Sequence, residues 1–183
     1  MEFLKELWGK LLSINPIPYL LALLVLTYMF VKIAQYRQVK TAAQQFNSGA
    51  TDDKTVQLCQ QLKPRHRRPK NAEMHDVVCC ILCAMHLERK EEELFFENLN
   101  SVKAMTRKIA WRVNLLLVAY LTGKRYLDLS VAYKEEKEED QGVQDWIFQQ
   151  DDLDYEPERL ATLKAKLTQD QVIEVLDSLV DED

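Results

Sequence analysis

The sequence predicts an all-α protein in which a single transmembrane helix precedes a helical domain. Three observations support this fold class. The 183 residues include only four Gly and five Pro, and Leu, Ala, Glu, Lys and Gln, which favour helices, are common. Residues 17–31 form one uncharged run that has no counterpart elsewhere in the chain. Beyond that run, apolar residues recur at helical spacing in segments that end at Gly, Pro or Asn.

Residues 1–15 are expected to form an amphipathic helix that lies in the membrane interface. Their apolar residues share one helical face. Two glutamates offset two lysines, so the segment lacks the basic start of a cleavable signal peptide. Asn15 and Pro16 then interrupt the helix.

Residues 16–34 are expected to cross the membrane once. A spanning helix needs roughly 20 mostly apolar residues. Lys32 can extend its ammonium group to the interface, so Ile33 and Ala34 continue the apolar stretch. Lys and Arg are denser on the C-terminal side of the span, which predicts that the C-terminal domain is cytoplasmic. The bacterial inner membrane is the default location, because no lipidation or organelle signal is evident.

The loop KPRHRRPK, residues 63–70, is the densest basic cluster of the chain. We expect it to contact lipid headgroups at the membrane surface through Arg65, Arg67, Arg68 and Lys70. Nucleic-acid binding is not expected. The cluster is one Pro-flanked loop without interleaved aromatic residues, and the chain has a net charge of −5.

Residues 35–137 are expected to form helices joined by short connections. The spanning helix continues to Phe46, and Thr51 or Asp52 can cap the next helix. That helix carries Val56 and Leu62 and ends at Lys63 and Pro64. The later helices are expected at about 71–86, 91–102, 108–121 and 126–133.

The helical region repeats with a period of 34 residues. The shift pairs apolar positions, namely Ile81 with Leu115, Leu82 with Leu116 and Met85 with Ala119. Gly49 and Gly123 stand in corresponding turns, whereas Arg89 stands where a third glycine would fall. With these features, about residues 34–137 resemble tetratricopeptide (TPR) repeats. The resemblance implies an α-solenoid of about three helical hairpins, with an insertion at the basic loop. An irregular helical bundle is the alternative.

In TPR repeats the first helix of each hairpin lines a concave groove, so the resemblance implies a groove for a protein partner. Its residues would be Arg37, Lys40, Gln44, Asp76, Cys79, Cys83, His86, Val113, Leu117 and Tyr120. Such a groove is basic at one end and apolar along its length, which suits an extended peptide that ends in acidic residues. The chain's own C-terminal VDED has this character, so self-occupation is a further hypothesis.

Residues 138–183 are expected to form an acidic tail with two short helices. Residues 1–133 carry a net charge of +7, and residues 134–183 carry a net charge of −12. Pro157 suits the first turn of one tail helix, and Thr168 and Gln171 have the spacing of a capping box for the other. The two helices either cap the stack or act as a tethered, ligand-like hairpin.

One face of the helix expected at 71–86 carries metal-ligating residue types. These are His75, Cys79, Cys83 and His86. Neighbours at i and i+4 meet, but four ligands along a straight helix span about 16 Å, too far for one ion. Cys59 and His66 are the other candidates. We therefore predict no metal site and no cofactor, with a metal or small-molecule sensor as the alternative.

These features predict a membrane-anchored scaffold or adaptor that binds a protein partner through the helical-repeat groove. An enzyme is not expected, because the chain has no phosphate-binding loop, zinc-protease motif or nucleophile elbow. The sensor is one alternative. The other is an accessory subunit of a larger membrane complex, although the span has no Gly-x-x-x-Gly pairing motif.

Overall fold

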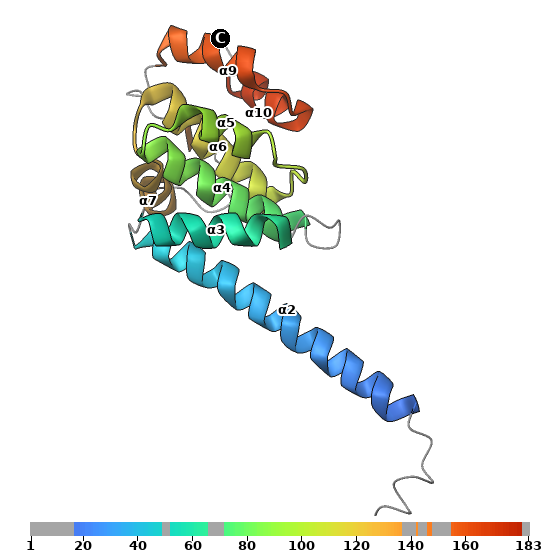
Figure 1. The fold of residues 1–183 in the computed structure, drawn as a ribbon. Coiled ribbons are helices and arrows are strands. Elements are labelled where there is room, and N and C mark those ends of the chain that lie inside the picture. The colour runs from blue at the N-terminus through green and yellow to red at the C-terminus, as the bar shows by residue number, and fades with distance from the viewer. Residues whose placement is uncertain are drawn as a thin grey trace, which may run out of the picture. The chain divides into compact units, whose positions relative to one another are not determined.

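The computed structural model describes residues 17–48, 52–65, 72–136, 142, 146–147 and 155–180. In these residues the chain forms eight α-helices and no strand (Figure 1), which confirms the all-α prediction. The helices are α2 (Ile17–Asn47), α3 (Asp53–Arg65), α4 (Ala72–Glu88), α5 (Glu92–Leu99), α6 (Arg107–Thr122), α7 (Tyr126–Glu136), α9 (Pro157–Lys166) and α10 (Asp170–Val180). The chain divides into two compact units, residues 1–38 and 39–183, and the boundary falls inside the continuous helix α2.

In the first unit, α2 exposes its apolar side chains all round. The large apolar residues from Ile17 to Ile33 are exposed, and an 18-residue window of α2 has a mean hydropathy of 2.0 with none of it buried. By length and composition the helix can cross a membrane. The expected interfacial helix at residues 1–15 lies outside the described residues.

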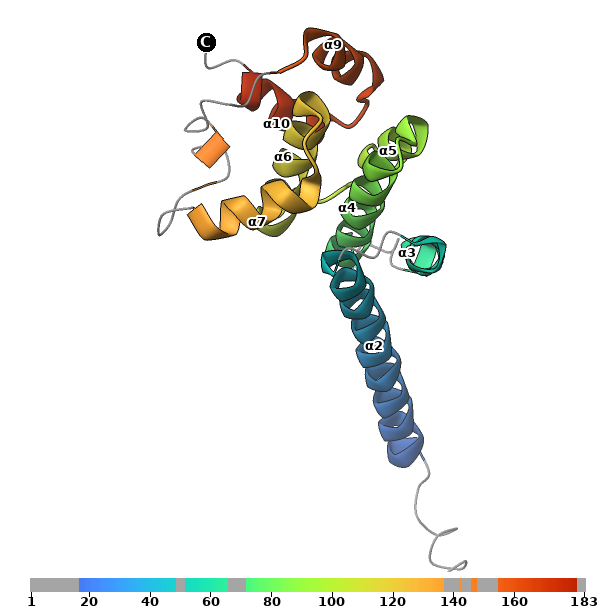
Figure 2. The ribbon, with the colours of Figure 1, turned by 90° about the vertical axis from the view of Figure 1, so that its left-hand side faces the viewer.

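The second unit is built around α4, which is buried on nearly all sides. Every residue from Val78 to His86 is buried, which is about two and a half turns of helix. Helices α3 and α5 pack on one side of α4, and α6 packs on the opposite side (Figures 1 and 2). A helix that is apolar on all faces is stable only in such an interior position.

Helix α6 is the second buried helix of this unit. Every residue from Val113 to Leu121 is buried. The 34-residue shift pairs Leu82 of α4 with Leu116 of α6, and both side chains are fully buried. The 34-residue shift therefore pairs two helices that are both buried in the core.

Asp76 joins α4 to the connection between α5 and α6. Its carboxylate is completely buried and accepts hydrogen bonds from the backbone N–H groups of Lys103 (3.1 Å) and Ala104 (2.7 Å). His75 Nδ1 lies 2.9 Å from the same carboxylate. A buried carboxylate is stable only when its oxygens are satisfied in this way. These hydrogen bonds therefore hold the loop between α5 and α6 against α4.

Two helix ends show how the local sequence sets the connections. Asp52 caps α3, because its Oδ1 accepts a hydrogen bond from the Thr55 N–H group (2.9 Å). In the turn after α4 the left-handed residue is Lys90, with φ of 60°, rather than the neighbouring Arg89. After α6 the left-handed residue is Gly123, with φ of 69°.

The tail helices α9 and α10 pack against α6. Five side chains of these two helices and their connection are buried, namely Leu163, Leu167, Val172, Leu176 and Leu179. The two helices thus cover α6, as expected of a cap. The predicted capping box at Thr168 is wrong, because α10 begins at Asp170. The carbonyl of Gln169 accepts the hydrogen bond from the Ile173 N–H group.

Replacing Asp76 by Ala should destabilise the protein by about 2–4 kcal/mol, because two buried N–H donors lose their acceptor. Thermal unfolding of the full chain in detergent, followed by circular dichroism, measures the loss. Asp53→Ala is the matched control. Its ion pair with Arg89 is exposed on the Asp53 side, so its loss should cost under about 1 kcal/mol. Equal losses in the two variants would contradict the role given to Asp76.

Candidate functional site

The second unit has a large cavity, the charged cavity, between the ends of α4 and α6 and the helix α9. Its volume is about 640 Å³. Most of its lining residues are charged or polar. They include His86, Glu88, Lys90, Glu91, Glu92, Tyr120, Lys124, Arg125, Glu156, Glu158 and Arg159. A cavity of this size is large enough for a small ligand.

Several charged groups of this cavity are already paired with each other. Arg125 lies 3.1 Å from Glu88, and His86 Nδ1 lies 2.6 Å from Glu91. The Tyr120 hydroxyl donates a hydrogen bond of 2.6 Å to Glu92. Burial, together with this carboxylate, raises the pKa of Tyr120, so its phenol stays protonated at neutral pH. The charged cavity therefore contains both positive and negative side chains, and these contacts pair several of them with each other.

Helix α9 closes one side of the charged cavity by satisfying the end of α6. Arg159 Nη1 donates to the Tyr120 carbonyl (2.8 Å), and the Glu156 N–H group donates to the Leu121 carbonyl (3.2 Å). These carbonyls belong to the last turn of α6, where no helical partner is available. Gly123 leaves room for the contact, since a Cβ there would lie 3.0 Å from Arg159 Nη1.

The connection between α9 and α10 is held by one amide side chain, that of Asn100. Its Nδ2 group donates to the Lys166 carbonyl (2.9 Å), and its Oδ1 accepts from the Thr168 N–H group (2.9 Å). The Lys166 ammonium also lies 2.7 Å from Glu93 and 5.2 Å from the centre of the Phe96 ring. The tail is therefore docked by specific polar contacts as well as by its buried leucines.

A second, smaller cavity lies among residues of α2, α4, α6 and α7, and we call it the apolar pocket. Its volume is about 200 Å³. Its lining residues are Ala43, Phe46, Asn47, Val77, Cys80, Ile81, Trp111, Arg112, Tyr126, Ser130 and Lys134. Most of these are apolar, and the two charged groups are both cationic.

Half of the ten residues predicted to line the groove are core residues in the structure. Asp76, Cys79, Cys83, Val113 and Leu117 are completely buried in the core. The face of α4 that carries the two cysteines is covered by α5, and the Cys83 thiol lies 3.5 Å from the Phe95 carbonyl.

The other five groove residues lie apart from that core. His86 and Tyr120 are buried and border the charged cavity. Arg37, Lys40 and Gln44 are exposed on α2. Lys40 and Gln44 lie on the face of α2 opposite the buried Val39 and Phe46. Of the ten residues, His86 and Tyr120 are therefore the two that share a cavity, and Arg37 belongs to the first unit.

The face of α4 and α6 that lines a pocket differs from the predicted one. Val77 and Ile81 of α4, with Trp111 and Arg112 of α6, line the apolar pocket. Sequence reasoning missed these residues as a site. Because α4 is apolar on every face, no periodicity distinguishes the open face from the covered ones.

The residues predicted to touch the membrane surface are mostly outside the described part of the chain. Arg65 ends α3, and nothing is described of its side chain. Arg67, Arg68 and Lys70 fall among residues 66–71, and the VDED tail falls almost wholly among residues 181–183. Contact with headgroups and self-occupation of a groove therefore stay predictions.

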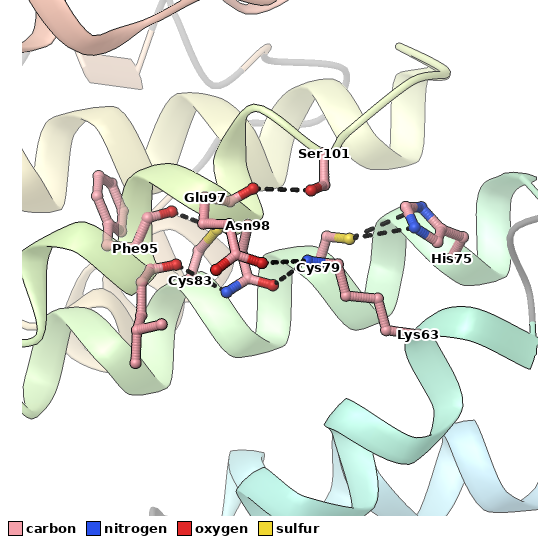
Figure 3. Close-up of polar contacts among 9 residues, drawn as sticks. Lys63, His75, Cys79, Cys83, Phe95, Glu97, Asn98 and Ser101 are labelled. Atoms are coloured by element: carbon pink, nitrogen blue, oxygen red, sulfur yellow. Dashed lines mark hydrogen bonds and ion pairs between the residues drawn. The ribbon is translucent and has the colours of Figure 1, made fainter.

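The cysteine and histidine face is dispersed into separate contacts (Figure 3). Cys79 Sγ lies 3.7 Å from His75 Nδ1, Cys83 faces the Phe95 carbonyl, and His86 contacts Glu91. Within the described ranges, no three His, Cys, Asp or Glu side chains form a set that can hold a metal ion. The geometry therefore gives no support to the metal sensor.

Burial also makes the four thiols poor ligands and nucleophiles. It raises the pKa of Cys59 and of Cys79 to about 12, and it raises the pKa values of Cys80 and Cys83 well above the usual range. The thiolate is the form that binds metals and attacks electrophiles. At neutral pH these residues are therefore neutral packing groups.

Thiol-reactive dyes should label the native cysteines slowly at pH 8, since the neutral, buried thiol is unreactive below the raised pKa. We expect rates at least about 100-fold below that of an exposed thiol introduced by Lys54→Cys. Mass spectrometry of the labelled full chain in detergent measures each site. Urea should bring all four to the rate of the control. Rapid labelling of Cys79 in the folded protein would contradict its burial.

Replacing Asn100 by Ala should loosen the tail, because the two backbone hydrogen bonds to the α9–α10 connection are lost. A loss of about 1–2 kcal/mol would speed amide hydrogen exchange in residues 167–180 by roughly 5- to 30-fold. Ser101→Ala is the control, since the Ser101 hydroxyl bonds only the Glu97 carbonyl of its own helix turn. Unchanged exchange in the Asn100 variant would show that the leucines alone hold the tail.

No family model matches this chain, and comparison with curated proteins and with solved structures gives no significant match. What the domain binds is therefore inferred from the contacts, burial and charges of its own residues.

Proposed function

We propose that this chain is a single-pass, membrane-anchored scaffold whose helical domain holds a protein partner at the cytoplasmic surface. Tethering raises the concentration of whatever the domain binds near the membrane. By default we assign the anchor to the bacterial inner membrane.

The observation that carries this proposal is the division of α2 into two parts of different burial. Its first half exposes large apolar side chains on every face, including Leu20, Leu24 and Phe30 at 58–70%. Its last turns bury Val39, Ala42 and Phe46 in the helical domain. Exposed apolar surface on this scale is unfavourable in water and favourable in a bilayer. One continuous helix thus has the composition of an anchor at one end and of a domain element at the other.

The orientation follows from charge and from the thiols. Lys32, Arg37 and Lys40 follow the apolar segment, and positive charge on that side favours a cytoplasmic domain. The cysteines are free, which agrees with a reducing compartment.

We further propose that the domain is TPR-like, with hairpins formed by the end of α2 with α3, α4 with α5, and α6 with α7. The equivalent burial of Leu82 and Leu116 supports this assignment. A departure from a simple stack is the contact between the first and last of these helices. The rings of Phe46 and Tyr126 lie 5.9 Å apart, which closes the domain on itself.

Binding is favoured over the other functions that we considered. The buried neutral thiols weaken the case for a sensor. For an accessory subunit, the span would need polar or small residues that pair with other helices. The Thr27 hydroxyl donates instead to the Leu23 carbonyl of its own helix (2.8 Å).

The double substitution Leu23→Arg and Leu26→Arg should remove the protein from the membrane, since each central Arg costs about 3 kcal/mol in a spanning helix. Carbonate extraction of membranes measures the retained fraction, and Gln45→Arg, on an exposed position of α2, is the control. Protease treatment of inverted vesicles should digest a C-terminal tag that intact cells protect. Full extraction of the unmodified protein, or protection of the tag in inverted vesicles, would contradict the proposal.

A further inference from the structure

We infer that the apolar pocket is a docking site for an acidic peptide segment of the partner, which inserts one apolar side chain between α2, α4, α6 and α7. This inference rests on the proposed scaffold function and deepens it by naming the chemistry of the partner.

The charge of the pocket is of one sign. Arg112 and Lys134 line it, and no acidic residue does so among its described lining residues. The Arg112 guanidinium donates to the Lys108 carbonyl of its own helix and stacks 4.5 Å from the centre of the Trp111 ring. No carboxylate of the described residues lies within ion-pair distance of Arg112 or Lys134. In the charged cavity, by contrast, both arginines are paired with glutamates.

The positive charge acts on the interior of the pocket. Burial raises the pKa values of Tyr126 and Cys80, and the charge of Arg112 opposes that rise. A cation that favours the anionic form of buried groups also favours a bound carboxylate. The pocket therefore presents a positive rim to an incoming ligand.

The size and lining of the pocket suit a single apolar side chain. Its volume of about 200 Å³ is below the roughly 300–1,000 Å³ of pockets that enclose drug-sized ligands. Phe46, Ile81 and Tyr126 supply buried apolar surface, while Val77 and Trp111 are only partly buried. Burial of one leucine-sized side chain there favours binding.

The rest of the domain surface offers little apolar area. In the described part of the second unit, the large apolar residues that stand exposed are Leu94 and Val131. They lie on different helices, so together they do not form an apolar docking surface. An apolar anchor of a partner is therefore best accommodated in the apolar pocket, beside the two cations.

A labelled peptide of sequence Glu-Asp-Leu-Asp-Glu tests the inference, with the full chain in detergent micelles and fluorescence anisotropy as the readout. Binding should weaken about fivefold in Arg112→Gln and in Lys134→Gln, and further in the double variant. It should also weaken as salt is raised. Arg125→Gln removes the same charge at the charged cavity and should leave the affinity within about twofold. Circular dichroism checks that each variant is folded.

The peptide itself supplies the second set of controls. Replacing its leucine by serine, or its acids by lysines, should abolish binding. Absence of binding by the original peptide, equal binding of these peptides, or equal affinity for the double variant would overturn the inference. So would Arg112-dependent binding of decanoate without binding of the peptide, since the occupant would then be a small amphipathic carboxylate.

Crosslinking of the full chain in its membrane separates this inference from the proposed function. A discrete partner that crosslinks equally to the unmodified chain and to the Arg112→Gln, Lys134→Gln double variant would contradict the docking site. The proposed scaffold function would then still be supported. A peptide that binds as expected, with no partner crosslinked to any variant, would leave the pocket standing and overturn the scaffold function.

Discussion

The burial of α4 from Val78 to His86 is the constraint on which the rest of the helical domain depends. From Val78 to His86 the helix is mostly apolar, and α3, α5 and α6 pack against it. The buried carboxylate of Asp76 then decides where the chain passes from α5 to α6, because two backbone N–H groups of that connection are its hydrogen-bond donors. Apolar packing alone would tolerate several arrangements of the helices, whereas a buried charge is satisfied in very few.

The tail follows the same logic at the other buried helix. The end of α6 exposes carbonyl groups that have no helical partner, and Arg159 and the backbone of Glu156 satisfy two of them. Asn100 holds the next connection through both of its amide atoms. The acidic C-terminal region therefore contributes structure to the domain through α9 and α10, and its docking depends on a small number of polar contacts that substitution can test separately.

The packing also determines which surface is left for a partner. Because α5 covers one face of α4, the cysteines on that face become core residues, and the histidines at its two ends turn to carboxylates. The open face lies beside α7, where Arg112 and Lys134 line the apolar pocket together with mostly apolar residues. Among the described residues, charges are paired in the charged cavity, whereas no such ion pair involves Arg112 or Lys134 at the apolar pocket. Electrostatic complementarity of this kind contributes more to specificity than to affinity.

The sequence by itself determined the all-α class, the apolar segment of α2, and the positions of the later helices to within a few residues. Each of these depends on local composition and spacing, which the chain carries wherever it folds. Only the tertiary structure decided which face of α4 is open. Val77 and Ile81 are as apolar as Cys79 and Cys83, so periodicity did not distinguish these faces, and the face expected for the groove came from the resemblance to TPR repeats. The contact of Asn100 with Thr168, just before α10, joins residues 68 positions apart, and such a long-range hydrogen bond leaves no mark in the local sequence.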